Sequence, residues 1–285
     1  MKKLIALLLC CVLVSVPFTS AVQLSHDTSP VPAKVISYSM NEYELLKSLS
    51  TESNDALCQM GYTDNQISKI NNLRSAYADH LEEISHYDRA ALENLGYTEA
   101  QINTLKNFNG SENQIMALAA TLNLDLSIAY VTWSESANRT NARLDFSFEW
   151  SGVPLIKVAD FLAISWNDWT INTKNAYVTY IPTNGTGISV TRAATYVANS
   201  GPTSMGAGFK FPMQINDTAQ WAESGYGTVT LYHNYVRKDL SAYAEYGHFT
   251  IGVSPSFYIP GYGSIVFEGG LNGVAEAWAD KTCSN

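Results

Sequence analysis

The chain has 285 residues with 26 acidic and 17 basic side chains, so its formal net charge is −9. Only 15% of the residues are charged, whereas 46% are hydrophobic and 17 are tyrosines, a composition typical of exported β-sheet proteins with neutral polar surfaces. The acidic balance excludes nucleic acid as a partner, because the phosphate backbone attracts basic surfaces, and the length suits one large domain or two smaller ones.

The N-terminus, residues 1–21, has the three parts of a cleavable signal peptide. Lys2 and Lys3 are basic, Leu4 to Val16 form an apolar run of 13 residues, and small residues precede a cleavage position after Ala21. The apolar run is shorter than the ~20 residues that a membrane-spanning helix needs. We therefore expect a secreted, extracellular protein, with attachment to the cell surface as the alternative. Cleavage would leave 15 basic against 26 acidic side chains, a net charge of −11.

Two cysteines, Cys58 and Cys283, remain once the signal peptide is removed. An oxidising exterior permits them to form a disulfide. Because this bond would close a very long loop, the chain-entropy model gives it a stabilisation of about 4 to 5 kcal/mol. Two separate thiols are the alternative, and the sequence does not decide between them.

Residues 22–37 are predicted to be a linker, and residues 38–122 a helical repeat region. Within this region the run Leu57–Ile67 recurs as Leu92–Ile102, 35 residues later. Each copy has the signals for the end of one helix and the start of the next. We predict five or six short helices that pack as a small bundle. A structural or pro-region bundle is favoured, and an array that docks a partner is the alternative.

The helix-end signals are specific residues at fixed offsets. Gly61 and Gly96 stand where a helix ends in a left-handed residue, which glycine adopts without steric cost. Capping boxes, in which a side chain and a backbone N–H bond each other reciprocally across three residues, are predicted at four helix starts. They are Ser39 with Glu42, Thr63 with Gln66, Thr98 with Gln101 and Ser111 with Gln114.

Residues 126–285 are predicted to form an antiparallel β-sandwich of the jelly-roll kind, so the fold class is α+β. Apolar and polar residues alternate along Arg143–Trp150 and Phe209–Ile215, the pattern of strands with one buried face. Pro212 in the second run indicates a strand edge or a bulge. Gly, Asn, Pro and Ser turns separate the other strand-like runs. These are Ile128–Trp133, Ile156–Ser165, Ala176–Ile181, Gly187–Val197, Thr228–Val236, Phe249–Val253 and Ser264–Phe267.

The segment Gly185–Gly208 is rich in small residues and contains Arg192 as its one formal charge. It is interpreted as a surface hairpin, or alternatively as a segment that inserts into a membrane. Its alternation breaks at Ala193 and Ala194, whereas a spanning strand needs about 9 to 11 alternating residues. A membrane surface is therefore only a secondary candidate partner.

Two aromatic clusters are the candidate ligand-binding residues. Trp166, Asp168 and Trp169 stand together beside a predicted turn, and Tyr258 and Tyr262 flank Pro260. Exposed aromatic rings beside polar groups suit the stacking of a sugar ring or the anchoring of a protein partner. The alternative for the first cluster is that at least one tryptophan belongs to the core.

No catalytic residue, cofactor or metal ligand is predicted. The sequence has no Gly-x-Ser-x-Gly nucleophile motif and no His-Glu-x-x-His metal motif. His233 and His248 with Glu245 would need three coincidences of register to bind a metal, so we interpret them as separate histidines bonded to neighbours. Many carboxylates fall in the predicted strands, but the sequence selects no pair for glycoside cleavage.

Outward positions of the predicted strands carry hydroxyl, amide and phenol groups. Such faces suit contact with sugars or proteins, and they are also ordinary for exported sheet proteins. Examples are Thr191, Thr195, Thr230, Tyr232 and Asn234. We therefore expect a secreted, non-catalytic β-sandwich protein that recognises an extracellular glycan or protein. The alternatives are a membrane-active toxin or bacteriocin-like protein, and an extracellular hydrolase whose site has no recognisable motif.

Overall fold

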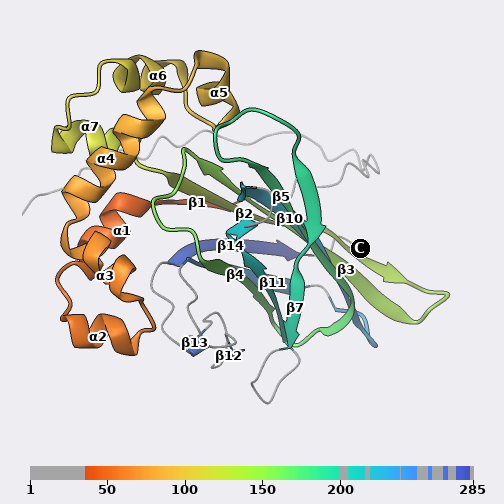
Figure 1. Cartoon of the computed structure of the whole chain (residues 1–285). Coiled ribbons are helices and arrows are strands. Elements are labelled where there is room, and N and C mark those ends of the chain that lie inside the picture. Colours follow the sequence, from red (N-terminus) through yellow and green to blue (C-terminus); the bar gives the residue numbers. More distant parts are fainter. Residues whose placement is uncertain are drawn as a thin grey trace, which may run out of the picture. The chain divides into compact units, whose positions relative to one another are not determined.

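The protein combines short α-helices with antiparallel β-sheets. The computed structural model describes residues 36–198, 205–215, 219–237 and 239–248, and the backbone of residues 256–258, 266–268 and 274–282. These residues form seven α-helices and 14 strands (Figure 1). The predicted signal peptide and Cys283 lie outside the described residues. The mixed helical and antiparallel-sheet class is confirmed.

The helices are 6 to 13 residues long and follow one another closely along the chain. They are α1 Glu42–Leu49, α2 Asn54–Gln59, α3 Asp64–Asn71, α4 Leu73–Ser85, α5 Arg89–Asn94, α6 Glu99–Lys106 and α7 Glu112–Leu118. The region is helical, as the sequence predicted, with slightly more helices than expected.

The repeated helix boundary of the sequence is confirmed in both copies. Gly61 and Gly96 have φ angles of 92° and 80°, in the left-handed region. The capping boxes of Thr63 and Thr98 with their glutamines are both complete. Tyr62, next to Gly61, is buried with the core residues. Each boundary therefore turns the chain sharply while keeping its helix ends hydrogen-bonded.

The two other predicted capping boxes are wrong. Ser39 lies in a strand, and the next helix is capped instead by Asn41, whose side chain accepts from the Glu44 backbone N–H. Ser111 is the N-cap of α7 but its side chain makes no cap hydrogen bond. The Gln114 side chain accepts from the Asn109 backbone N–H instead, so the local turn competes with the cap.

The strands run from the first described residue to the last. They are β1 Ile36–Asn41, β2 Thr121–Ser134, β3 Arg139–Ser151, β4 Ala159–Trp166, β5 Thr170–Pro182, β6 Val190–Ala193, β7 Thr195–Ala198, β8 Gly206–Pro212, β9 Gln214–Ile215, β10 Gln220–His233, β11 Asp239–Gly247, β12 Ser256–Tyr258, β13 Val266–Glu268 and β14 Val274–Thr282. All pairings between them are antiparallel, as predicted.

Two larger sheets contain most of these strands. The first sheet has the order β1-β2-β3-β10-β5-β6, with β9 also paired to β10, and the second has the order β14-β11-β4-β8-β7. β12 and β13 pair with each other. The chain passes from the edge of the first sheet to the edge of the second between β6 and β7. The segment Gly185–Gly208 is therefore not one hairpin, because β6 pairs with β5 in the first sheet, whereas β7 pairs with the start of β8 in the second sheet.

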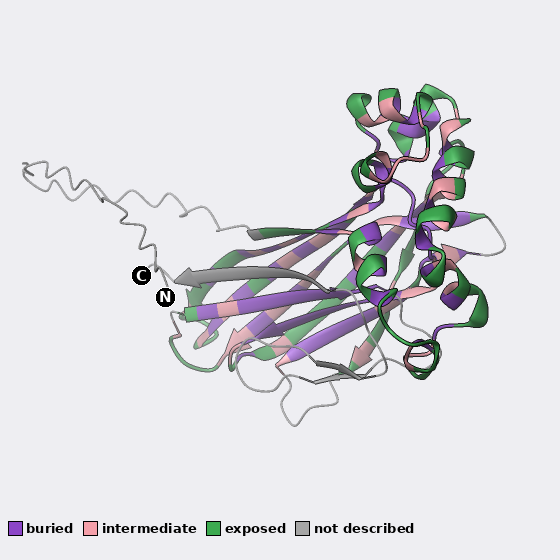
Figure 2. Ribbon diagram, turned by 90° about the vertical axis from the view of Figure 1, so that its left-hand side faces the viewer, coloured by how far each residue is buried: buried purple, intermediate pink, exposed green. Residues whose placement is uncertain are grey.

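The two sheets pack face to face through the alternating residues of β3. Leu144, Phe146, Phe148 and Trp150 are all buried, as their period of two predicted. Phe146 stacks on Phe209 of β8 at a centroid distance of 5.5 Å, and Phe148 stacks on Phe211 at 5.1 Å. Figure 2 shows the resulting alternation of buried and exposed residues along the strands.

The helices gather at one end of the strands and share a core with the sheets (Figures 1 and 2). One hydrophobic cluster contains both helical and sheet residues, from Leu46 of α1 to Tyr246 of β11. Hydrogen bonds join the two parts directly, because the Gly152 N–H donates to Leu95 O and Ser151 Oγ donates to Gly96 O. The hydrophobic period of the sequence thus changes between residues 122 and 126 because the secondary structure changes from helix to strand. Both parts belong to one hydrophobic core.

Several strands differ from the sequence prediction, and β12 and β14 coincide with none of the strand-like runs identified in the sequence. β1 occupies the end of the predicted linker and the start of the predicted helical region, and it pairs with β2, which begins at Thr121. β11 was missed because Ala242 and Ala244 give it a weak alternation. The run Phe249–Val253 lies outside the described residues. Among the described residues, no helix has the length and hydropathy to cross a membrane.

Candidate functional site

The outer face of the first sheet is polar across four neighbouring strands. On β3 the residues that alternate with the buried ones are Asn141, Arg143 and Asp145, and none of the three is buried. Across the strand pairs they lie opposite hydroxyl and phenol groups, with Tyr232 paired to Asn141 and Thr230 to Arg143. The polar outward positions proposed from the sequence at Thr230 and Tyr232 therefore belong to one continuous surface.

A β-bulge in β2 turns Tyr130 onto this outer face. The register between β2 and β3 shifts between Ile128 and Tyr130, with Ala129 as the extra residue. Strict alternation after the buried Ile128 would have pointed Tyr130 into the core. The bulge exchanges the faces, so Val131 is buried and Tyr130 is 37% exposed.

A second bulge lies across the sheet in β5. The register between β10 and β5 shifts between Thr230 and Leu231, which leaves Asn172 as the extra residue. Thr230 Oγ1 accepts from Asn172 Nδ2 at 3.4 Å and from the Thr173 backbone N–H at 3.0 Å. The hydroxyls of Thr173 and Thr230 are 2.5 Å apart. These contacts fix the amide and hydroxyl groups at this point of the sheet.

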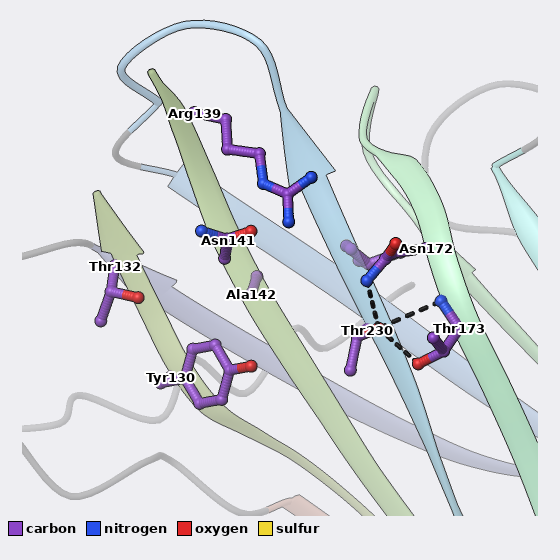
Figure 3. Close-up of a pocket in the computed structure, with 9 residues that line it drawn as sticks. Tyr130, Thr132, Arg139, Asn141, Ala142, Asn172, Thr173 and Thr230 are labelled. Atoms are coloured by element: carbon purple, nitrogen blue, oxygen red, sulfur yellow. Dashed lines mark hydrogen bonds between the residues drawn. The ribbon is translucent and has the colours of Figure 1, made fainter. Parts of the chain in front are cut away.

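A shallow groove of about 710 Å³ lies between the two bulges. We call it the Tyr130 groove, and its lining residues are Tyr130, Thr132, Arg139, Asn141, Ala142, Asn172, Thr173, Thr230 and Leu231. Figure 3 shows these side chains coming from four neighbouring strands. Hydroxyl, amide, phenol and guanidinium groups thus converge on one accessible surface.

Arg139 is the charged residue among those that line the groove. Its guanidinium carbon lies 5.4 Å from the centroid of the Tyr232 ring, a cation–π arrangement. Its Nε atom is buried and has no hydrogen-bond partner among the described residues. A second depression, of about 260 Å³, adjoins it on the same face and contains Arg143 and Asp145, which form an ion pair at 2.7 Å.

The candidate tryptophans lie in the core rather than on the surface. Trp166 is 4% exposed and Trp169 is 2% exposed. The Trp166 indole N–H donates to Trp169 O at 2.9 Å, and the Trp169 indole donates to Asp239 O at 3.1 Å. Asp168 between them is exposed, has a φ of 31° and pairs with Arg237 at 2.8 Å. This placement matches the alternative in which the tryptophans are core residues.

The other residues singled out from the sequence are only partly described. Tyr258 lies on β12, whose backbone alone is described, and Tyr262 lies outside the described residues. Cys58 is on α2 and its thiol is exposed. Its proposed partner Cys283 lies outside the described residues, so the disulfide stays a prediction.

A buried polar cluster, which we call the Glu42 cluster, joins the helices to both sheets. The carboxylate of Glu42 on α1 accepts from Tyr77 Oη at 2.5 Å and from the Leu155 and Ile156 backbone N–H groups at 2.8 and 3.1 Å. His248 Nε2 lies 3.5 Å from the same carboxylate. All of these groups are excluded from solvent.

The other ring nitrogen of His248 contacts a second carboxylate. His248 Nδ1 lies 2.8 Å from Asp160 Oδ2 on β4, and Tyr246 Oη donates to the same oxygen at 2.5 Å. The ring of His248 also packs on Trp150, with centroids 4.8 Å apart. The interpretation of His248 as a histidine bonded to neighbours agrees with these contacts. Among the described residues, no group of three His, Cys, Asp or Glu side chains is arranged to hold a metal ion.

The charges of the Glu42 cluster stabilise one another. Burial by itself lowers the pKa of His248, but the charges of Asp160 and Glu42 and the hydrogen bonds with them raise it to about 9. Burial by itself raises the pKa of Glu42, but His248, Tyr77 and Leu155 outweigh burial and hold the pKa below its ordinary value. The cluster is thus an imidazolium between carboxylates. Since it is fully buried, we assign it to holding the helices on the sheets.

Comparisons with known proteins give no family for the chain. No protein-family model matches it, and no curated protein matches it either. Solved structures match only weakly. The collagen-binding domain of a Staphylococcus aureus adhesin has a TM-score of 0.25 at 5% identity, covering 52% of this chain and 93% of that domain.

Two other weak matches concern an adhesin domain and a toxin. The C-terminal domain of the Streptococcus agalactiae AgI/II polypeptide BspA has a TM-score of 0.29 at 8% identity, covering 57% of this chain and 58% of that one. Clostridium perfringens delta-toxin has a TM-score of 0.24 at 9% identity, covering 58% and 89%. At these TM-scores the likenesses carry no functional argument, so the function is argued from the site.

Proposed function

We propose that this chain is an exported binding protein that recognises an extracellular glycan through the Tyr130 groove. The observation that carries the proposal is the pair of β-bulges at either side of the groove. Bulges redirect side chains at the cost of ladder hydrogen bonds, and they occur preferentially beside functional sites. Here one bulge brings Tyr130 to the surface and the other brings Asn172 to the opposite side of the groove.

The groups in the groove suit a sugar better than a protein. Asn141 and Asn172 each offer a donor and an acceptor, and Thr132 and Thr173 offer hydroxyls, so they match the mixed donors and acceptors of sugar hydroxyls. The ring of Tyr130 offers a flat apolar surface beside them. The centre of a protein interface is more apolar than this groove. A glycan is therefore the ligand class that the lining favours.

Secretion and the finer features of the fold belong to the same proposal. The basic, apolar and small-residue order of residues 1–21 supports export. Two packed antiparallel sheets support a sandwich, of which the jelly-roll connectivity remains an expectation. An extracellular location would bring the exposed outer face into contact with polysaccharides.

The test is binding of the mature protein to immobilised chitin, galactan, hyaluronan and polygalacturonate, with Tyr130→Ala as the site variant. We expect the wild type to bind at least one of these polysaccharides and Tyr130→Ala to bind it about tenfold more weakly. Tyr196→Ala is the matched control, because Tyr196 is 39% exposed on the second sheet, close to the 37% of Tyr130. This control should bind like the wild type.

Three results would contradict the glycan proposal. The first is that the protein binds none of the polysaccharides. The second is that Tyr130→Ala and Tyr196→Ala weaken binding equally. The third is binding to immobilised extracellular protein without any binding to carbohydrate. Dye release from liposomes would favour the membrane-active alternative, and release of shortened sugars would favour the hydrolase alternative.

A further inference from the structure

We infer that the Tyr130 groove selects a glycan that carries a carboxylate, and that Arg139 binds this carboxylate. The inference rests on the proposed function and adds the chemical class of the ligand. Arg139 stands at the start of β3, beside the hairpin that joins it to β2. Its side chain reaches over the groove from this end (Figure 3).

The guanidinium of Arg139 is held in place without being neutralised. Tyr232 lies under it at 5.4 Å and restricts its position. Its Nε–H is buried and finds no acceptor among the described residues. Because this atom is shielded from solvent, a ligand in the groove would meet the terminal nitrogens of the guanidinium, which have no carboxylate beside them among the residues that line the groove. The position is therefore prepared for a group that accepts hydrogen bonds.

The charges of the neighbouring depression provide a contrast within the same strand. Arg143 follows Arg139 four residues later on the same face of β3, but its Nε is already 2.7 Å from Asp145 Oδ1. The described residues that line the Tyr130 groove include no carboxylate to pair with Arg139. Of these two arginines, Arg139 is thus the one whose charge is available to a ligand.

A carboxylate fits this arginine in charge and in shape. The guanidinium offers parallel N–H donors in a plane, which match the two oxygens of a carboxylate. With residues 1–21 removed the net charge is −11, so no long-range attraction favours an anionic glycan and its selection depends on the local contact with Arg139. Because Arg139 is the charged residue of an otherwise neutral lining, we expect a uronic-acid type of sugar at Arg139 and neutral sugars along the rest of the groove.

The test compares two ligands that differ only in the carboxylate. Oligogalacturonate and its methyl ester share one backbone, and their affinities for the full mature protein are measured by calorimetry. We expect the methyl ester to bind about tenfold more weakly than the acid, the size of effect that one charge-assisted hydrogen bond provides. Equal affinities for the acid and the ester would overturn the inference.

Arginine variants identify the residue responsible. Arg139→Gln should weaken binding of the acid about tenfold and leave binding of the ester unchanged. Arg143→Gln, which removes the same charge from the same strand, should change neither affinity by more than about twofold. Arg139→Lys should restore part of the preference, because it keeps the charge but loses the planar donors. Equal effects of the two glutamine variants would assign the preference to net charge and overturn the role of Arg139.

The inference can fail while the proposed function survives. If a neutral polysaccharide binds, Tyr130→Ala weakens this binding about tenfold and the acid has no advantage over its ester, the groove is a glycan site without carboxylate selection. If neither ligand nor any polysaccharide binds, the proposed function itself fails. Circular dichroism of each variant verifies that it is folded, so a loss of binding is read only from folded protein.

Discussion

Glu42 is completely buried, and its environment explains how a charge persists there. Two backbone N–H groups, the Tyr77 hydroxyl and the ring of His248 surround its carboxylate. The partners belong to α4, to the loop after β3 and to the residue that follows β11. One side chain on the first turn of α1 thereby connects three distant parts of the chain.

Replacing Glu42 by glutamine should destabilise the protein by about 3 to 5 kcal/mol, the cost of removing one partner from a buried charged pair. The glutamine amide has the shape of the Glu42 carboxylate, but its NH₂ group faces the hydrogen-bond donors that contact Glu42. The substitution also removes one of the two negative charges beside His248. Urea denaturation measures the change. Glu44→Gln is the control on the same turn, since Glu44 is exposed. Its effect should stay within about 0.5 kcal/mol, and a similar small effect at Glu42 would show that the cluster is not stabilising.

Stability should pass through a maximum as the pH is varied. The pKa of His248 is raised to about 9, so its contribution is complete below pH 6.5 and is lost as the pH rises through 9. The pKa of Glu42 is lowered, so its contribution is present above pH 4.5 and is lost in acid. Burial lowers the pKa of His80 to about 4, so the unfolded state takes up its proton first and stability also falls below pH 6.5.

Urea midpoints measured across this range test the two limbs separately. His80→Gln should reduce the loss of stability below pH 6.5 and leave the loss of stability near pH 9 unchanged. An unfolding free energy that stays constant up to and beyond pH 9 would contradict the charged state assigned to His248.

Part of the candidate site was predictable at the level of single residues. Thr230 and Tyr232 were identified because strict alternation places them outward. Tyr130 was not identified, because the bulge at Ala129 reverses the face of every later residue in the strand. No local sequence pattern indicates such a bulge. Arg139 was missed because it follows a hairpin loop. Its significance comes from Tyr232, which lies on another strand.

At the scale of elements, local signals succeeded where they were redundant. The Gly61 and Gly96 boundaries combine a left-handed glycine, a capping box and a buried apolar residue, and all of these agree. At Ser111 the sequence signals are only a cap residue and a glutamine three residues later. The Gln114 side chain accepts from the Asn109 backbone N–H, so it does not complete a capping box. Strand β3 was predictable from its own alternation of apolar and polar residues. Strand β1 was not, because it pairs with β2, which lies about 85 residues away in sequence.

Thr98→Ala should destabilise the protein by about 1 kcal/mol, because the Thr98 side chain accepts from the Gln101 N–H at the start of α6. Ser111→Ala is the matched control at the start of α7, where the side chain makes no cap hydrogen bond. Its effect should be close to zero. Thermal and urea denaturation of the two variants give the comparison. Equal losses would mean that the capping box does not account for the difference between the two helix starts.

At the scale of the whole described structure, the helices and the sheets form one core. The sequence predicted a helical part and a sheet part, because hydrophobic period reports the local structure of a segment. It does not report which other segment covers the apolar face. Leu92 and Ile102 on the helices and Trp150 on β3 belong to the same cluster. The Glu42 cluster adds a polar connection at this junction between α1, α4 and the sheets.

This arrangement leaves the outer face as the accessible surface on which two bulges, Tyr130 and Arg139 meet. We expect a glycan to bind there, and a crystal structure of the protein with the oligosaccharide retained in the binding assay would show its position. Sugar rings in contact with Tyr130, Asn141 and Thr230, with a carboxylate on Arg139, are the expected result. An oligosaccharide bound on the second sheet or on the helices, with the Tyr130 groove empty, would contradict it.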